Sequence, residues 1–401
     1  MTSSTTYIDL FAGCGGLSLG LMNAGWHGLF AVEKDRFAFE TLKHNLIESA
    51  KHFSWPAWLP KKPHDINALI KTYQAEIRKL RGTISLVAGG PPCQGFSVNG
   101  RREEKDKRNS LVEAYVEFVD LVRPEMVLFE NVKGFTMEFA KKGTGAVYSE
   151  HVIQRLRDLD YDVEAKLLNF GDYGVPQRRW RFILVGRRKG KAKEFFDRLD
   201  AAKLAFLESR SLGTQQTVSQ AISDLHVSHG TLDCPDSARF LSGRYGAART
   251  AYQKLMRSGV STKTPDSHRF ANHRPDIAER FAELLESAPR NKQLSADIRA
   301  NYQIKKRSIT PLHRARISPT ITSLPDDYIH YQEPRVLTVR ECARIQSFPD
   351  SFEFKGKYTS GGDRRAKEVP RYTQVGNAVP PLFAELAGHV LLSLIAASPE
   401  A

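Results

Sequence analysis

Short apolar runs alternate with amphipathic stretches through the first half of the chain. The runs have the length and composition of buried strands, and the stretches between them repeat apolar residues at helical spacing. The predicted strands are 7–11, 29–32, 84–88, 126–129, 163–168 and 180–185. The predicted helices are 17–24, 37–47, 68–80, 111–121 and 148–159. This alternation predicts an α/β domain built on a doubly wound sheet.

The strand and helix rhythm stops near residue 186. Gly, Ser, Thr and basic residues then interrupt the pattern, and no repeat of 20–50 residues is present. Regular patterning resumes at 338–346, and helical apolar spacing runs over 382–396. We expect a smaller, irregular second domain and a last helix that returns to the first domain. The expected divisions are 1–186, 187–339 and 340–401.

Length and composition place the chain among ordinary globular proteins. It has 401 residues, of which 41% are hydrophobic and 26% charged, so disordered, collagen-like and small disulfide-rich classes are excluded. The longest apolar stretch, 390–397, is far shorter than the roughly 20 residues that cross a bilayer. The four cysteines form no Cys-x-x-Cys pair, so no zinc site or disulfide framework is indicated. We expect a cytoplasmic protein with no metal and no membrane partner.

The net charge of +14 is concentrated in the middle of the chain. Residues 187–339 hold 26 Lys and Arg against 16 Asp and Glu, which accounts for +10. Such a local excess favours a face that binds a polyanion, although a surface charged for solubility has the same composition.

A glycine-rich loop follows the first predicted strand. The loop is Asp9-Leu-Phe-Ala-Gly-Cys-Gly-Gly16. Its backbone amides and the start of the next helix can bind an anionic group. The alternative is that the glycines only allow a tight connection between strand and helix. The spacing is not the Gly-x-Gly-x-x-Gly of dinucleotide-binding proteins, yet Glu33 ends the second strand where a ribose-binding acid is expected. An adenosine-containing cofactor without a pyrophosphate fits this pattern better than NAD.

Three further motifs lie at the same predicted edge of the sheet, two of them after strands and the third at the start of the sixth strand. Cys93 lies in Gly90-Pro-Pro-Cys-Gln-Gly95, on a stiff loop where a thiolate nucleophile could be presented, although most free cysteines are inert and buried. Glu130 and Asn131 follow the next strand. In Gln177-Arg-Arg-Trp-Arg181, strand alternation predicts that Arg179 and Arg181 point to the same face.

Together with Arg340-Glu-Cys-Ala-Arg-Ile-Gln-Ser-Phe-Pro349 and Gln374-Val-Gly-Asn-Ala-Val-Pro380, these motifs make the chain similar to the DNA (cytosine-5)-methyltransferase family of bacterial restriction-modification systems. The resemblance covers 7–188 and 338–396. It leaves the basic middle unmatched, which in the family is the domain that recognises the DNA target.

The resemblance implies S-adenosylmethionine as cofactor and a defined set of residues around it. Asp65 is an ambiguous member of this set, because it is also placed to cap the following helix. The implied cofactor residues are Asp9, Phe11, Gly13, Gly15, Glu33, Asp65, Pro91, Asn377 and Val379.

The resemblance also implies a mechanism. Cys93 would add to C6 of a cytosine rotated out of the duplex, which makes C5 nucleophilic. A protonated Glu130, fixed by Asn131, would neutralise charge at N3. Arg179 and Arg181 would stabilise O2 of the base and its flanking phosphate.

The substrate implied by the resemblance is double-stranded DNA. Ser97, Arg101 and Arg102 belong to the loop after the cysteine, which closes over DNA in this family. In the middle region, the run Lys305-Lys306-Arg307 is a dense basic cluster, for which phosphate contact or solvation of a helix end is possible.

Other functions remain to be weighed against DNA methylation. One branch of the family methylates tRNA, but it has a short recognition region with a Cys-Phe-Thr signature, and here the region has 153 residues and lacks that signature. A non-catalytic relative would have lost Cys93 or Glu130, and a dinucleotide-dependent oxidoreductase would need the missing glycine. Because the first motif starts at Asp9, we expect a stand-alone, monomeric modification enzyme whose functional partner is a restriction endonuclease.

Overall fold

The computed structural model describes residues 5–92, 109–136, 148–362, 364 and 367–396. The chain forms two compact units. The first comprises Met1–Asn169, Trp180–Lys203 and Phe383–Ala401, and the second comprises Phe170–Arg179 and Leu204–Leu382.

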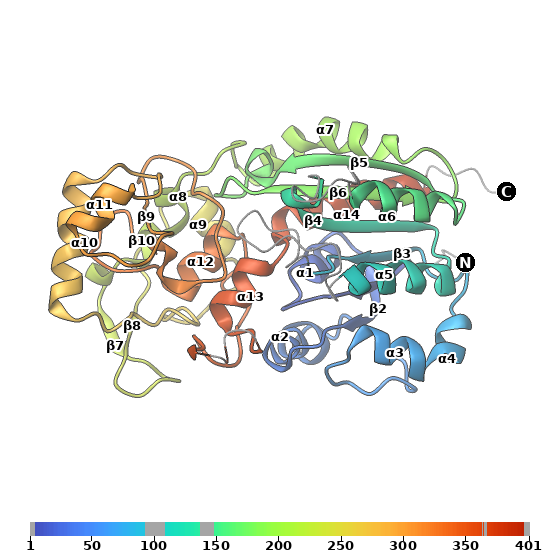
Figure 1. The fold of residues 1–401 in the computed structure, drawn as a ribbon, viewed down its shortest axis with the longest axis horizontal. Coiled ribbons are helices and arrows are strands. Elements are labelled where there is room, and N and C mark those ends of the chain that lie inside the picture. Colours follow the sequence, from blue (N-terminus) through green and yellow to red (C-terminus); the bar gives the residue numbers. More distant parts are fainter. Residues whose placement is uncertain (1–4, 93–108, 137–147, 363, 365–366, 397–401) are drawn as a thin grey trace. The chain divides into compact units, whose positions relative to one another are not determined.

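The first unit is built on a six-stranded sheet in the order β2-β1-β3-β4-β6-β5 (Figure 1). The strands are β1 (Thr6–Leu10), β2 (His27–Val32), β3 (Leu86–Gly89), β4 (Met126–Val132), β5 (Asp162–Asn169) and β6 (Trp180–Arg187). The first four are parallel, and β6 runs antiparallel to both β4 and β5. The α/β prediction is therefore confirmed, and all six predicted strands are present in this unit.

Helices flank both faces of this sheet (Figure 1). They are α1 (Gly16–Asn23), α2 (Arg36–Leu42) with a π-helical continuation (Lys43–Ser49), α3 (Ile66–Thr72), α4 (Gln74–Arg78), α5 (Asn109–Val122), α6 (Tyr148–Arg157), α7 (Lys193–Glu208) and α14 (Pro381–Ala396), of which α7 and α14 cross into the second unit. The single helix predicted at 68–80 is in fact two helices that meet at Tyr73, which has a non-helical backbone.

One apolar core fills the space between the sheet and helices α3 to α6. Val87 and Phe129 of the sheet and Phe118 of α5 are fully buried in it. These strands read as continuous apolar runs because parallel strands are covered on both faces.

Helix α14 packs against the end of α1 and the turn that follows it. The indole Nε1 of Trp26 donates to the carbonyl oxygen of Gly388 (2.9 Å), and a Cβ on Gly388 would lie 2.7 Å from Ala24 Cβ. The helical stretch Arg371–Ala396 is long and apolar enough to cross a membrane, but 67% of its most apolar window is buried inside the protein. The mostly buried core helix of a globular protein meets the same criteria of length and composition, so this stretch is only weak evidence for a membrane-spanning helix.

The second unit contains short helices and small two-stranded sheets. The helices are α8 (Val218–Ile222), α9 (Ala251–Met256), α10 (Pro275–Ser287), α11 (Ala296–Asn301), α12 (Val339–Ile345) and α13 (Arg371–Asn377). The strands are β7 (Thr231–Asp233), β8 (Leu241–Gly243), β9 (Thr310–Pro311) and β10 (Tyr328–Ile329). Phe281, Leu284 and Ile329 belong to its apolar core.

The units divide the chain differently from the expected domains. Residues 170–179 already belong to the second unit, the chain enters that unit again inside α7 after Lys203, and residues 340–382 belong to it as well. Buried ion pairs hold α12 within this unit. Arg344 pairs with Asp224 (3.2 Å) and Asp350 (2.5 Å), and all three side chains are fully buried.

Candidate active site

The glycine-rich loop after β1 has an unusual backbone. Phe11, Gly13 and Gly15 all have positive φ, at 59°, 57° and 96°. A side chain at Gly13 would meet no atom within 4 Å, so the loop faces open space at that point. Positive φ is costly for Phe11, and such strain at a ligand loop is typical of a preorganised binding site.

Glu33 joins this loop to the end of β2. Its carboxylate accepts hydrogen bonds from the amides of Gly13 (2.9 Å) and Asp35 (2.6 Å). Burial raises the pKa of Glu33, and these amide bonds oppose the rise. Because each carboxylate oxygen has a second acceptor position, Glu33 can also accept bonds from a ligand's hydroxyl groups.

Asp9 lies buried beneath the loop. One carboxylate oxygen accepts a hydrogen bond from Ser18 Oγ (2.5 Å), and the other is buried with no hydrogen-bond partner among the described residues. Burial, aided by the charge of Glu33, raises the pKa of Asp9 to about 7. A buried oxygen without a partner is unusual in folded proteins, and a bound water or ligand is one way to satisfy it.

Asp65 caps a helix. Its Oδ1 accepts from the amides of Asn67 (3.1 Å) and Ala68 (3.2 Å) at the start of α3, and its Oδ2 pairs with Lys34 (2.8 Å). Burial raises the pKa of Asp65, but these partners outweigh it and the net pKa is lowered. The structure therefore supports the capping alternative for Asp65, and its contact with adenine stays a prediction.

The start of the cysteine loop packs against Glu130 and Asn131. A Cβ at Gly90 would lie only 2.9 Å from Glu130 Oε2, so glycine allows the close approach of loop and carboxylate. The side-chain amide of Asn131 donates to the carbonyl oxygen of Pro91 (3.3 Å). Asn131 thus contacts the loop backbone, where we had expected it to fix the Glu130 carboxyl group.

Glu130 and Arg181 form an ion pair at the end of the central strands. Arg181 Nε lies 2.9 Å from Glu130 Oε1, and the two side chains are only 13% and 14% exposed. The antiparallel register sets the pair, because Val132 lies opposite Arg181 and Glu130 opposite Ile183. Burial lowers the pKa of Arg181, and the carboxylate opposes this effect. Two of the predicted catalytic side chains are therefore in direct contact.

Arg179 belongs to the second unit and has other contacts. Its guanidinium is 1% exposed and donates to the carbonyl oxygens of Ile321 (3.2 Å) and Gly376 (2.8 Å). These bonds support a role in holding the loop before η6 (Pro325–Asp327) to helix α13. β6 begins at Trp180, directly after Arg179, and the common face expected for Arg179 and Arg181 stays a prediction.

Gln177 is a buried residue of this motif that sequence reasoning did not assign a role. It donates from Nε2 to the carbonyl oxygen of Ile345 (3.1 Å) and accepts from the amide of Ile321 (3.0 Å). The only sequence feature that could have indicated this role is the position of a glutamine directly before a run of arginines.

Several predicted site residues are not tested by these contacts. Asn377 and Val379 belong to the second unit, where Asn377 is exposed and Val379 partly buried. Four predicted residues, Cys93, Ser97, Arg101 and Arg102, lie outside the described residues.

The basic run at 305–307 divides into two kinds of side chain. Lys305 and Arg307 are exposed. Lys306 points the other way and pairs with Asp326 and, at 2.7 Å, with Asp327. Lys306 is therefore held by carboxylates of its own unit, and only its two neighbours have the exposure that a phosphate contact requires.

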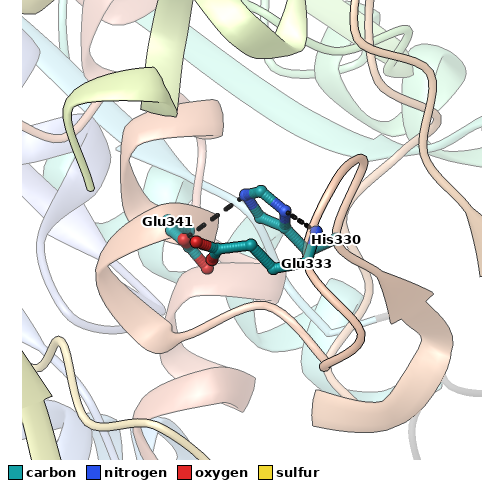
Figure 2. Close-up of side chains that lie close together, drawn as sticks. All are labelled: His330, Glu333 and Glu341. Carbon is teal, nitrogen blue, oxygen red and sulfur yellow. Dashed lines mark hydrogen bonds and ion pairs between the residues drawn. The ribbon is translucent and has the colours of Figure 1, made fainter. Parts of the chain in front are cut away.

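His330, Glu333 and Glu341 have ligand atoms within 4.8 Å of one another, close enough to hold a metal ion (Figure 2). However, Arg335 already pairs with Glu333 (2.5 Å) and Glu341 (2.6 Å). His330 Nδ1 also accepts from the amides of Gln332 (3.1 Å) and Glu333 (3.0 Å). Since the guanidinium of Arg335 already pairs with both carboxylates, we assign this cluster to the ion-pair network of the second unit.

Known proteins resemble the chain over nearly its whole length. It is 31% identical to the Type II methyltransferase M.DdeI of Desulfomicrobium norvegicum, with 94% of this chain and 86% of that protein covered. It is also 31% identical to the Type II methyltransferase M.XorII of Xanthomonas oryzae pv. oryzae, with 98% and 86% covered.

A solved structure described as a prophage-encoded DNA modification methyltransferase of E. coli matches with a TM-score of 0.68 and 25% identity, covering 98% of this chain and all of that one. The S. pombe Dnmt2 methyltransferase shares the fold, with a TM-score of 0.55, 15% identity and 98% and 99% covered. The profile of the C-5 cytosine-specific DNA methylase family matches residues 5–392. The chain therefore belongs to the C-5 cytosine-specific DNA methylase family.

Proposed function

We propose that the protein transfers a methyl group from S-adenosylmethionine to C5 of a cytosine within a specific sequence of double-stranded DNA. The observation that carries this proposal is the buried Glu130–Arg181 pair. Glu130 packs against Gly90, and Cys93 follows Gly90 by three residues in the chain. A nucleophile, an acid and a cation are the groups that addition to a cytosine ring requires.

The residues after β1 and β2 fit the proposed cofactor. Open space beside Gly13, the unpartnered oxygen of Asp9 and the remaining acceptor positions of Glu33 offer an adenosine compound a polar cradle. Phe11 provides an apolar surface beside it. S-adenosylmethionine, when bound, supplies a methyl group on a sulfonium.

Cys93 would add to C6 of the cytosine, which makes an enamine of the ring and directs C5 to the methyl group. C5 takes the methyl group, the C5 proton then passes to solvent water, and the bond between Cys93 and C6 breaks with its electron pair returning to sulfur, so the thiolate is regenerated. The cytosine must leave the base stack for this reaction, at an unstacking cost of a few kcal/mol.

The Glu130–Arg181 pair implies an exchange of partners when the base enters. In the pair, Glu130 is a carboxylate balanced by a guanidinium. For Glu130 to donate toward N3 it takes up a proton, and Arg181 is then released to contact O2 of the cytosine. Arginine suits this change because its planar donors serve a carboxylate and a carbonyl oxygen equally well.

The second unit would read the DNA sequence. Its basic composition supports contact with phosphates, and the exposed Lys305 and Arg307 are suitable donors. The family's Type II relatives support a role as the modification enzyme of a restriction-modification system. In this proposal the protein acts in the cytoplasm as a monomer, with a separate endonuclease as its functional partner.

Cys93→Ser tests the covalent step. We expect the variant to bind S-adenosylmethionine but to lose methyl transfer, because a hydroxyl is a much weaker nucleophile at neutral pH. DNA carrying 5-fluorocytosine should trap the wild type as an adduct that survives denaturation, since fluorine cannot leave as a proton. Activity above a few per cent in the variant, or no adduct with the wild type, contradicts the proposal. Bisulfite sequencing of DNA from expressing cells identifies the target.

A further inference from the structure

We infer that a hollow in the second unit, lined by Arg178 and Arg316 among others, binds one phosphodiester of the substrate duplex. This inference rests on the proposed function, because the ligand is part of the same DNA. The hollow has a volume of about 330 Å³, and Gln215 and Thr217 also line it.

Hydrogen bonds to the backbone hold three chain segments together around the hollow. The amide of Arg178 donates to the carbonyl oxygen of Ser318 (2.7 Å), and the amide of Val218 donates to the carbonyl oxygen of Arg316 (2.9 Å). Thr320 Oγ1 donates to the carbonyl oxygen of Arg178 (2.6 Å). Both arginines therefore start from fixed backbone positions, which lowers the entropy cost of ordering them on a ligand.

The charge of the hollow is unbalanced. Arg178 and Arg316 are exposed, and neither has an ion-pair partner among the described residues. By contrast, Arg344 and Arg371 of the same unit each pair with an aspartate. Two guanidiniums without a carboxylate favour an anionic ligand, and the planar donors of arginine match phosphate oxygens in pairs.

The size and lining favour a phosphate over a base. A volume of about 330 Å³ is room for a phosphodiester with part of its hydration shell. Its lining residues include no aromatic side chain on which a base could stack.

Arg178 differs from its neighbours in the Gln177–Arg181 motif. Gln177 is buried against α12, and Arg179 is buried on backbone carbonyls, while the side chain of Arg178 remains exposed. The contacts that hold its neighbours thus leave Arg178 available for DNA.

The double variant Arg178→Gln with Arg316→Gln tests the inference by the salt dependence of duplex binding. Loss of one phosphate contact should reduce the slope of log K against log salt by about 0.9. The control variant, Arg239→Gln with Lys292→Gln, removes the same charge from two exposed residues of this unit that do not line the hollow. We expect the control to keep the wild-type slope.

A conservative variant guards against misfolding. Arg178→Lys with Arg316→Lys keeps both charges, so the slope should stay near that of the wild type. An unchanged slope in the glutamine variant, or an equal reduction in the control, overturns the inference. Failure of the wild type to methylate any duplex would instead overturn the proposed function, and the two results are measured separately.

Discussion

Replacement of Arg335 by methionine is expected to destabilise the second unit by about 3 kcal/mol. Arg335 donates to both carboxylate oxygens of Glu341, at 2.8 and 2.6 Å, and the two side chains are 8% and 0% exposed. Burial raises the pKa of Glu341, but the charge and hydrogen bonds of Arg335 outweigh it and lower the pKa from 4.5 to about 2. At 1.36 kcal/mol for each pKa unit, this difference corresponds to about 3 kcal/mol. Removing one partner of a buried pair costs a similar ~3–5 kcal/mol.

The pH dependence separates the lost charge from lost packing. In the wild type, the depressed pKa of Glu341 gives stability that is complete above pH 4.5 and lost as pH falls toward 2. In the variant, the main group that opposes burial is gone and contacts such as the Thr338 amide remain, so we expect the pKa of Glu341 to rise above 4.5 and stability to fall as pH rises. Two neighbouring histidines act in the same direction. Burial lowers the pKa of His268 to about 4 and that of His330 below 6.5, and the charge of Arg335 lowers both further. Without Arg335 both pKa values rise, so between pH 5 and pH 7 the histidines add less stability to the fold in the variant than in the wild type. The variant should therefore lose more stability at pH 7 than at pH 5.

Hydrogen exchange of the α12 amides is a suitable assay. All four tryptophans, Trp26, Trp55, Trp58 and Trp180, belong to the first unit, so their fluorescence does not report on α12. A loss of about 3 kcal/mol makes exchange through unfolding more than a hundredfold faster. Arg274→Met is the control, because the Arg274–Asp276 pair is exposed and contributes under ~1 kcal/mol. Exchange within tenfold of the wild type at pH 7, or equal losses at pH 5 and pH 7, would refute the reasoning.

Three further predictions concern the sites themselves. Arg181→Lys should reduce kcat by roughly 10²-fold or more while leaving cofactor affinity unchanged, as measured by steady-state methyl transfer and calorimetry; equal kcat values would exclude a transition-state role for Arg181. Neutralising Lys305 and Arg307 together should flatten the salt dependence of DNA binding, whereas Lys306→Gln should mainly lower the melting temperature, and the opposite pattern would contradict the ion-pair assignment. Asp9→Asn should remove a decline in stability as pH rises from about 4 to about 7, because the raised pKa of Asp9 disfavours its charged form in the fold; a decline of the same size in the variant would assign it to another group.

The sequence was sufficient for the sheet and for the family motifs because both depend on local patterns. Apolar runs such as 84–88 must be buried on both faces, and this requirement holds whichever elements cover them. The end of each parallel strand is then the expected place for ligand residues, so the association of Glu130 with the cysteine loop follows from strand order alone.

Tertiary structure decided which charged side chains are available. Lys306 and Arg307 are adjacent in the sequence, yet one is paired with aspartates and the other is exposed. Arg178 and Arg179 differ in the same way. Charge and local spacing are identical within each pair, and only the position of distant carboxylates and carbonyl oxygens separates them. A buried cation needs such partners to offset the loss of water, and these partners come from chain segments that only folding brings together.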